Sequence, residues 1–212
     1  MIDPLGGPAY WWPYILGFVI CYLIGSIPFG LILTRMTGVG DLRSIGSGNI
    51  GATNVLRTGR KGVALATLVL DALKGAIQVW IAGRYFGPDM AIVAGLGAVL
   101  GHCFPIWLKF NGGKGVATAA GVVIVLTPWV ALLALLFFVV IVRITSYVSL
   151  GSVLAAIISV PLAFYFNQVQ AAEFYILLAI IIIIKHQANI RRLIAGNESK
   201  TTLGKSTLSE KI

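Results

Sequence analysis

The sequence predicts an all-α integral membrane protein that crosses the bilayer seven times. Hydrophobic residues make up 58% of the 212 positions and charged residues only 11%, whereas soluble domains average about a quarter charged. The apolar residues gather in long runs, several of them near the roughly 20 residues that a membrane-spanning helix needs. Lysine and arginine outnumber acidic residues by 16 to 7 and are concentrated between and after these runs. The fourth and fifth predicted spans are short and turn near Pro128.

The first predicted span covers residues 14–33. It follows an N-terminal extension, residues 1–13, that carries the aromatic pair Trp11 and Trp12. Aromatic side chains of this kind are typical of the membrane interface. Pro28 lies near the end of the span and removes one helical hydrogen bond, so we expect a kink there.

The second predicted span, residues 63–81, carries three polar side chains. Asp71, Lys74 and Gln78 are three and four residues apart, so they share one face of a helix. A charge near the centre of a bilayer costs about 2.5–3.5 kcal/mol, so this face must point into the protein. Two interpretations remain open: a buried ion pair that fixes helix packing, or a polar support beneath the loops.

The distribution of basic residues decides the topology of the remaining spans. The apolar run 116–142 is interrupted at Pro128, and we interpret it as a hairpin of two short helices of roughly 13 residues, about 20 Å each. A single kinked helix would separate the basic C-terminus from the other basic segments, against the positive-inside rule. The hairpin predicts an outside N-terminus and a cytoplasmic C-terminus. The other predicted spans are 90–107, 148–166 and 174–184, within one membrane domain over 14–193 that precedes a tail over 194–212.

A polar, glycine-rich loop over residues 44–62 separates the first two spans. Its glycines allow positive φ and close approach of a ligand, and they alternate with hydroxyl, amide and cationic side chains. Backbone N–H groups beside cations bind phosphate or another oxyanion. The residues concerned are Gly46, Gly48 and Gly51, then Ser47, Asn49, Thr53 and Asn54, then Arg57, Arg60 and Lys61.

A second loop, residues 109–115, repeats this chemistry in the sequence NGGKG. It is not a nucleotide-binding P-loop, because Leu108 and Gly115 stand where that motif needs glycine and then Ser or Thr. We interpret the loop as a phosphate nest that leads into a helix N-terminus. A plain glycine turn with a surface lysine is the alternative. The candidate binding residues are Asn111, Gly112, Gly113, Lys114 and Gly115.

A third polar segment follows the last span. His186 and Asn189 lie three residues apart and share a helical face. His186 can accept a proton during catalysis or can be a hydrogen-bonded interfacial residue, and the sequence leaves both open. Glu198 is the carboxylate of this segment. Ser149 and Ser152, in the polar stretch before the sixth span, have no Ser-His-Asp setting.

Several other functions are excluded. GSGNIG, residues 46–51, matches a dinucleotide-binding pattern, but it follows an apolar membrane helix instead of a β-strand. No cluster of Cys, His and carboxylates has metal-ligand spacing, so we expect neither a metal nor a cofactor, and we interpret His102 as structural. Cys21 and Cys103 fit small buried hydrophobes. Nucleic acid is not an expected partner, because no basic helix lies outside the apolar runs.

Three segments together carry a family resemblance. They are GSGNIGATNVLRTGRKG, HCFPIWLKFNGGKGVATAAGV and KHQANIRRLIAGNE. This combination resembles the three motifs of the PlsY family, the acyl-phosphate-dependent glycerol-3-phosphate acyltransferases of bacterial phospholipid synthesis. The resemblance implies that the 1-hydroxyl of sn-glycerol 3-phosphate attacks the carbonyl of a fatty acyl phosphate, giving lysophosphatidic acid and phosphate. It also implies a multi-pass inner (plasma) membrane protein with its site facing the cytoplasm.

The resemblance assigns roles by matching positions. It implies catalytic roles for Ser47, Arg57, His186 and Asn189. The expected partners are glycerol 3-phosphate, fatty acyl phosphate and membrane lipid, and the protein is expected to be a monomer. The general base stays open between His186 and the phosphate of glycerol 3-phosphate. The expected substrate-binding residues are Asn49, Thr53, Asn54, Asn111, Gly112, Gly113, Lys114, Gly115, Ser149, Ser152 and Glu198.

A transporter or channel for phosphate or another small anion is the second hypothesis. The intramembrane charges Asp71 and Lys74 and the interrupted helices would suit it. The basic residues, however, gather on one predicted face, and the chain shows no inverted repeat.

Overall fold

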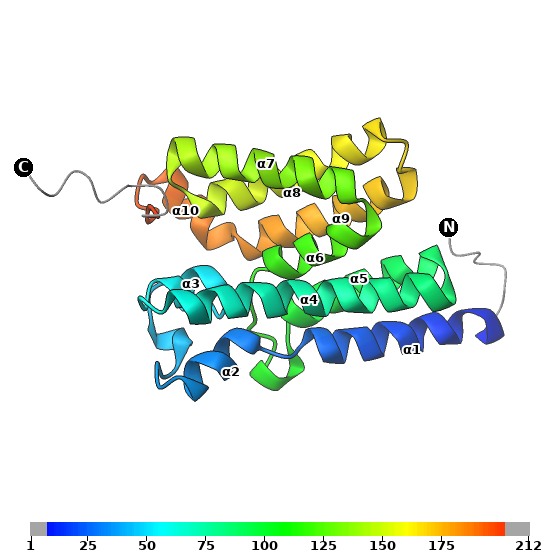
Figure 1. Ribbon diagram of the computed structural model, residues 1–212, viewed down its shortest axis with the longest axis horizontal. Helices are drawn as coiled ribbons and strands as arrows, with labels where there is room; N and C mark the ends of the chain where they lie inside the picture. Colours follow the sequence, from blue (N-terminus) through cyan, green and yellow to red (C-terminus); the bar gives the residue numbers. More distant parts are fainter. Residues whose placement is uncertain (1–7, 202–212) are drawn as a thin grey trace, which may run out of the picture.

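The computed structural model describes residues 8–201 (Figure 1). The predicted N-terminal extension therefore lies outside the described residues up to position 7, and the predicted tail lies outside them from position 202. Within the described range the 3-10 turns are η1 (Leu42–Ser44) and η2 (Ile106–Leu108). The α-helices are α1 (Pro8–Gly25), α2 (Phe29–Met36), α3 (Ala52–Leu56), α4 (Lys61–Phe86), α5 (Pro88–Cys103), α6 (Val116–Leu126), α7 (Pro128–Thr145), α8 (Val148–Tyr165), α9 (Val169–Lys185) and α10 (Gln187–Ile194).

Five described segments are long and apolar enough to cross a membrane, with α1 and α2 counted as one. The helices α9 and α10, which are bent by 63°, form a sixth candidate together. The prediction of two short helices around Pro128 was wrong for the second one: α6 has 11 residues, but α7 has 18 and is a full candidate span. The chain does turn there, and Pro128 is the first residue of α7. Proline is tolerated at this position because its missing N–H costs no helical hydrogen bond.

The kink predicted at Pro28 is a full interruption. The first helix ends at Gly25, and α2 begins at Phe29; the carbonyl of Ile27 between them accepts from the N–H of Phe29 and also from a side chain of α4. Several spans also exceed their predicted limits: α4 extends to Phe86, and α9 begins at Val169.

The helices form two groups with α6 between them (Figure 1). In one group α5 packs against both α1 and α4, and in the other α8 packs against both α7 and α9. Small residues permit this close packing. A Cβ atom at Gly101 would lie 2.2 Å from the carbonyl oxygen of Tyr22 on α1, and one at Gly121 would lie 2.0 Å from that of Ala72 on α4.

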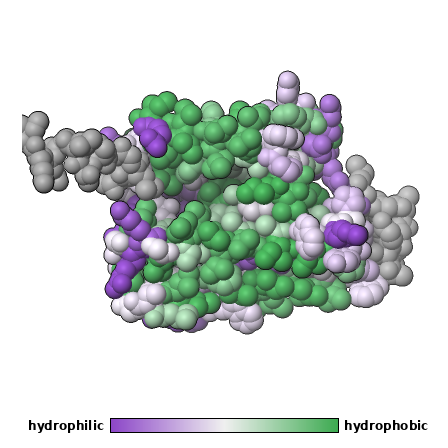
Figure 2. Space-filling model, in the orientation of Figure 1, coloured by the Kyte–Doolittle hydropathy of each residue, from purple (hydrophilic) through white to green (hydrophobic). Residues whose placement is uncertain are grey.

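The outer surface of the helices is apolar. Figure 2 shows hydrophobic residues over most of one face and hydrophilic residues gathered toward its two ends. Large side chains such as Leu65, Trp80 and Leu135 are more than half exposed. Exposure on this scale in water would be unfavourable, so the surface fits a protein surrounded by lipid.

The short helix α6 creates the space for a recessed site. It has 11 residues against 18 in α7, a difference of about 10 Å in helical rise. The two helices meet at Pro128 and run in opposite directions (Figure 1). The N-terminus of α6 therefore lies on the order of 10 Å short of the far end of α7.

Candidate active site

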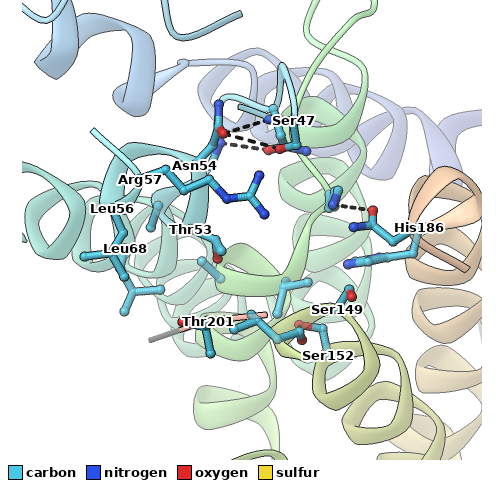
Figure 3. A pocket seen from close by; sticks show the side chains of 18 of the residues that line it. Ser47, Thr53, Asn54, Leu56, Arg57, Leu68, Ser149, Ser152, His186 and Thr201 are labelled. Atoms are coloured by element: carbon cyan, nitrogen blue, oxygen red, sulfur yellow. Dashed lines mark hydrogen bonds between the residues drawn. The ribbon is translucent and has the colours of Figure 1, made fainter. Parts of the chain in front are cut away.

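A cavity of about 400 Å³ lies at the N-terminus of α6 and is lined by all three polar segments (Figure 3). The first loop and the segment after α9 face each other across it, and in Figure 3 Arg57 and His186 extend into it from opposite sides. The predicted residues that line the cavity are Ser47, Asn49, Thr53, Asn54, Arg57, Lys114, Gly115, Ser149, Ser152, His186, Asn189 and Glu198. Asn111, Gly112 and Gly113 do not line it.

The first loop is shaped by the side chain of Asn54. This residue is 2% exposed, and its Nδ2 donates to the carbonyl oxygens of Leu42 and Ile45 at 3.0 and 2.9 Å. Its Oδ1 accepts from the backbone N–H of Ser47 at 3.1 Å and from the Ser47 hydroxyl at 3.4 Å. Gly46, with φ of 55°, passes so close that a Cβ there would lie 2.5 Å from the same Oδ1. Asn54 therefore holds Ser47 at the cavity wall.

Arg57 joins the first loop to the C-terminal segment. It lies directly after the short helix α3 and is exposed to the cavity. Its Nη2 donates to the hydroxyl of Ser199. The guanidinium therefore keeps a fork of N–H donors at the mouth of the cavity, where an anion can replace a neutral hydroxyl.

The second loop is held by backbone pairing with the end of α5. The N–H of Gly112 donates to the carbonyl of Cys103 at 3.3 Å, and that of Gly113 donates to the carbonyl of His102 at 3.0 Å. A Cβ at Gly113 would lie 2.0 Å from Nε2 of His102. The two glycines thus serve close packing behind the cavity, while Lys114 and Gly115 form its wall.

Lys114 is positioned by the third polar segment. Its Nζ donates to Oδ1 of Asn189 at 2.5 Å, and Nδ2 of Asn189 donates to Oε1 of Glu198 at 2.5 Å. Burial lowers the pKa of Lys114 to about 8, with Arg192 and Arg57 adding to the effect and Glu198 opposing it. Burial thus disfavours the charged form of Lys114, and a phosphate bound beside it would favour that form.

Glu198 connects the C-terminal segment to α8 and α10. Besides Asn189, it accepts hydrogen bonds from the Ser149 hydroxyl at 2.8 Å and from Nε of Arg192 at 2.7 Å. Burial raises the pKa of its carboxyl, but these hydrogen bonds outweigh burial and keep the pKa below its usual value. The chain turns back after α10 at Gly196, whose φ is 72°, and Thr201 N–H donates to the carbonyl of Ser146 at 2.8 Å.

His186 lies at the bend between α9 and α10 and is 2% exposed. Its Nδ1 is 2.8 Å from the carbonyl oxygen of Ile182. A carbonyl can only accept, so Nδ1 carries the proton and Nε2 is free to accept one. His186 is thus arranged as a neutral acceptor on the cavity wall.

The cavity also contains residues that the sequence analysis did not assign to it. Asp71 of α4 and His102 of α5 reach its wall, although His102 was interpreted as structural. The sequence analysis singled out Asp71 as a charge within a predicted span, but no sequence spacing linked Asp71 to His102. On the apolar side the wall is formed by Leu56, Leu68, Val116, Ala117, Phe138 and Val148. Among residues 8–201, no group of three or more His, Cys, Asp and Glu side chains could hold a metal ion.

Comparison with known proteins places these residues in a family. A sequence model described as glycerol-3-phosphate acyltransferase matches residues 15–196. Curated proteins of that name include one from Mesorhizobium japonicum, 57% identical over 88% of this chain and 95% of its own, and one from Erythrobacter litoralis, 54% identical over 86% and 92%.

Two solved structures are also similar. They are crystal structures of PlsY, an integral membrane glycerol 3-phosphate acyltransferase. The glycerol 3-phosphate form has a TM-score of 0.85 and 40% identity, covering 89% of this chain and 96% of its own. The lysophosphatidic acid form has a TM-score of 0.83 and 39% identity, covering 90% and 97%. The chain belongs to the glycerol-3-phosphate acyltransferase family.

Proposed function

We propose that the protein transfers a fatty acyl group from acyl phosphate to the 1-hydroxyl of sn-glycerol 3-phosphate. The observation that carries this proposal is the composition of one cavity: Arg57 and Lys114 supply two cations, and Leu68 and Phe138 supply an apolar side. Both reactants are phosphate anions, and the donor also has a long apolar chain. In the reaction the hydroxyl oxygen bonds to the acyl carbon, the bond from that carbon to the phosphate oxygen breaks, and phosphate leaves.

The two phosphates have separate partners in this proposal. Lys114, supported by Asn189 and by the N-terminal N–H groups of α6, binds glycerol 3-phosphate. Arg57 binds the phosphate of the donor through its fork of N–H groups, in place of the Ser199 hydroxyl. The acyl phosphate is already activated, so holding the two reactants together and neutralising charge supply most of the catalysis.

The carbonyl and the attacking hydroxyl lie near Ser47 in this arrangement. Ser47 is exposed on the cavity wall, and Asn54 fixes its backbone. Its hydroxyl can donate to the acyl carbonyl oxygen as negative charge develops there.

Two groups can take the proton of the attacking hydroxyl. One is Nε2 of His186, and the other is the phosphate of glycerol 3-phosphate, whose second pKa is about 6. His186→Gln separates them, because glutamine can hydrogen-bond but does not titrate. Full activity of this variant would exclude His186 as the base, and a loss of about 100-fold in kcat would support it.

The acyl chain lies along the apolar wall. Leu68 is 47% exposed, so the cavity meets the lipid-facing surface at α4. Val116 and Ala117 of α6 and Phe138 of α7 continue the wall inward. One similar structure was solved in a lysophosphatidic acid form, which is the product expected here.

We propose seven membrane passes in the bacterial inner membrane, with the cavity facing the cytoplasm. The six candidate spans and the short α6 give seven segments. The basic loops lie at the end of the helix bundle that holds the cavity. The positive-inside rule predicts that an end rich in basic residues faces the cytoplasm. Nothing in the proposed reaction requires a second copy of the chain, which fits a monomer.

An assay in detergent tests the proposal against an anion transporter. Purified protein is mixed with acyl phosphate and glycerol 3-phosphate, and release of phosphate and formation of lysophosphatidic acid are measured. We expect both products only when both substrates are present, and their loss in Arg57→Ala. Without a membrane barrier a transporter yields neither product, so their absence in a folded preparation would contradict the proposal.

A further inference from the structure

A buried cluster of charged and titratable side chains lies directly behind the second loop, residues 109–115. It consists of Asp71 and Lys74 on α4 and His102 in the last turn of α5, which are 2%, 6% and 5% exposed. The mechanism above uses none of the three. Such groups cost several kcal/mol unless they are paired, so their retention in an apolar bundle needs an explanation.

Lys74 connects three separate parts of the chain. Its Nζ lies 2.8 Å from Oδ1 of Asp71, 3.0 Å from Nδ1 of His102 and 2.9 Å from the carbonyl oxygen of Ile27. Ile27 lies in the interruption between α1 and α2, which frees its carbonyl from a continuous helix. The ammonium group therefore joins α4, the end of α5 and the interrupted first span.

Lys74 also fixes the orientation of His102. An ammonium group has no lone pair, so Nδ1 of His102 accepts this hydrogen bond, and Nε2 is the protonated nitrogen of the neutral ring. The ring edge that carries Nε2 lies against Gly113, where a Cβ would be 2.0 Å away. The backbone carbonyl of His102 accepts from the N–H of Gly113, and it lies 2.2 Å from where a Cβ of Gly112 would be.

We infer that Asp71, Lys74 and His102 are positioning residues that set the place of Lys114 for glycerol 3-phosphate. The carbonyl of His102 accepts from the N–H of Gly113, its ring lies against the same glycine, and Lys114 is the next residue along the chain. Helix packing alone would not require His102 to contact the loop with both its side chain and its backbone. The inference rests on the proposed role of this loop in binding glycerol 3-phosphate.

His102→Leu tests it, because leucine keeps bulk but cannot accept from Lys74. We expect glycerol 3-phosphate to bind about tenfold more weakly, with a matching rise in its KM, while the KM for acyl phosphate changes by less than about threefold. His102→Asn places an amide oxygen near the Nδ1 position and should restore binding to within about threefold of the wild type. Binding is measured by calorimetry on the full chain in detergent, and both KM values by phosphate release.

Gln78→Leu is the matched control. It removes another buried polar side chain from the same face of α4, one whose Nε2 donates within its own helix, to the carbonyl of Lys74. It should leave both KM values within about threefold of the wild type. If His102→Leu does not fold, His102→Gln replaces it, since its longer side chain cannot present an oxygen at the Nδ1 position.

Three results would overturn the inference. One is a folded His102→Leu variant with unchanged affinity for glycerol 3-phosphate, and another is an equal loss for both substrates. A His102→Asn variant no better than leucine is the third. If the wild type binds glycerol 3-phosphate but does not use acyl phosphate, the proposed donor is contradicted. The glycerol 3-phosphate affinities of the wild type, His102→Leu and His102→Asn, measured by calorimetry, would still decide this inference.

Discussion

The two glycine-rich loops have similar composition but use it differently. In the first loop, Gly46 and Gly48 adopt positive φ, and a side chain, Asn54, holds the surrounding backbone. In the second loop Gly115 also has positive φ, but Gly112 and Gly113 have ordinary φ and are needed because the end of α5 approaches closely. The first loop presents several side chains to the cavity, whereas the second contributes Lys114 and the start of a helix.

This difference shows that a glycine can be required for two separable reasons. A glycine at positive φ serves the shape of its own segment, and a glycine at a close contact serves the segment behind it. The two loops should therefore respond differently to substitution, which the following predictions use in order of expected effect.

Arg57→Lys should cause the largest loss, because it removes the chemical group that the first loop presents. Lysine keeps the charge but cannot offer two parallel N–H donors to a phosphate. We expect kcat/KM for acyl phosphate to fall by about 100-fold without loss of folded protein. Steady-state phosphate release checks this, and near-native turnover would contradict the role given to the guanidinium.

Gly113→Ala should separate the two uses of glycine. The added Cβ would lie 2.0 Å from His102 Nε2, so the loop must shift, and we expect the KM for glycerol 3-phosphate to rise about 30-fold. Gly59→Ala is the control, because Gly59 has φ of 78° but no neighbouring atom within 4 Å of the added Cβ. It should cost about 1 kcal/mol of stability and change KM little. Equal effects on KM would remove the distinction.

Asn54→Ala tests whether a side chain holds the first loop. It leaves the N–H of Ser47 without its partner and removes one of two hydrogen bonds at each of the carbonyls of Leu42 and Ile45, at a cost of about 1–3 kcal/mol in unfolding free energy. We expect a lower unfolding temperature in detergent and a kcat reduced about tenfold, because Ser47 loses its support. The matched control is Asn111→Ala in the second loop, an exposed asparagine that should cost under about 0.5 kcal/mol.

The pH dependence of the second loop should be the smallest effect. The pKa of Lys114 is lowered to about 8, so the ammonium is present below this pH and is lost above it. Affinity for glycerol 3-phosphate should therefore fall as pH rises, with KM increasing about fivefold between about pH 7 and about pH 9. In Lys114→Arg the charge persists, so the same measurement should give a flat profile.

The membrane class and most of the site could be predicted because composition and local motifs carry them directly. The three polar segments, and within them Arg57, Lys114 and His186, do meet in one cavity. Helix lengths were predicted less well: the apolar run ends before Arg143, but α7 continues through Arg143 to Thr145, because a basic side chain in the last turn does not interrupt a helix. The contact of His102 with Lys74 joins two helices and depends on packing that no local pattern reports.

The role of the second loop's glycines shows the same limit. Their composition fits a nest that wraps an anion, and the sequence analysis assigned Asn111, Gly112 and Gly113 to substrate binding. The structure places these three outside the cavity wall and pairs the glycines with α5. A sequence shows that a backbone must come close to something, but not whether that is a ligand or a neighbouring helix.

The shortness of α6 bears on a side reaction. For the proposed donor, water is a rival nucleophile that would waste the activated acyl group by hydrolysis. Because α6 starts on the order of 10 Å short of the far end of α7, Lys114 lies in a recess whose wall also includes Arg57 and Ser199. In the proposed reaction Lys114 binds the phosphate of the alcohol in this recess, whereas water has no such anchor, so the arrangement favours ester formation over hydrolysis.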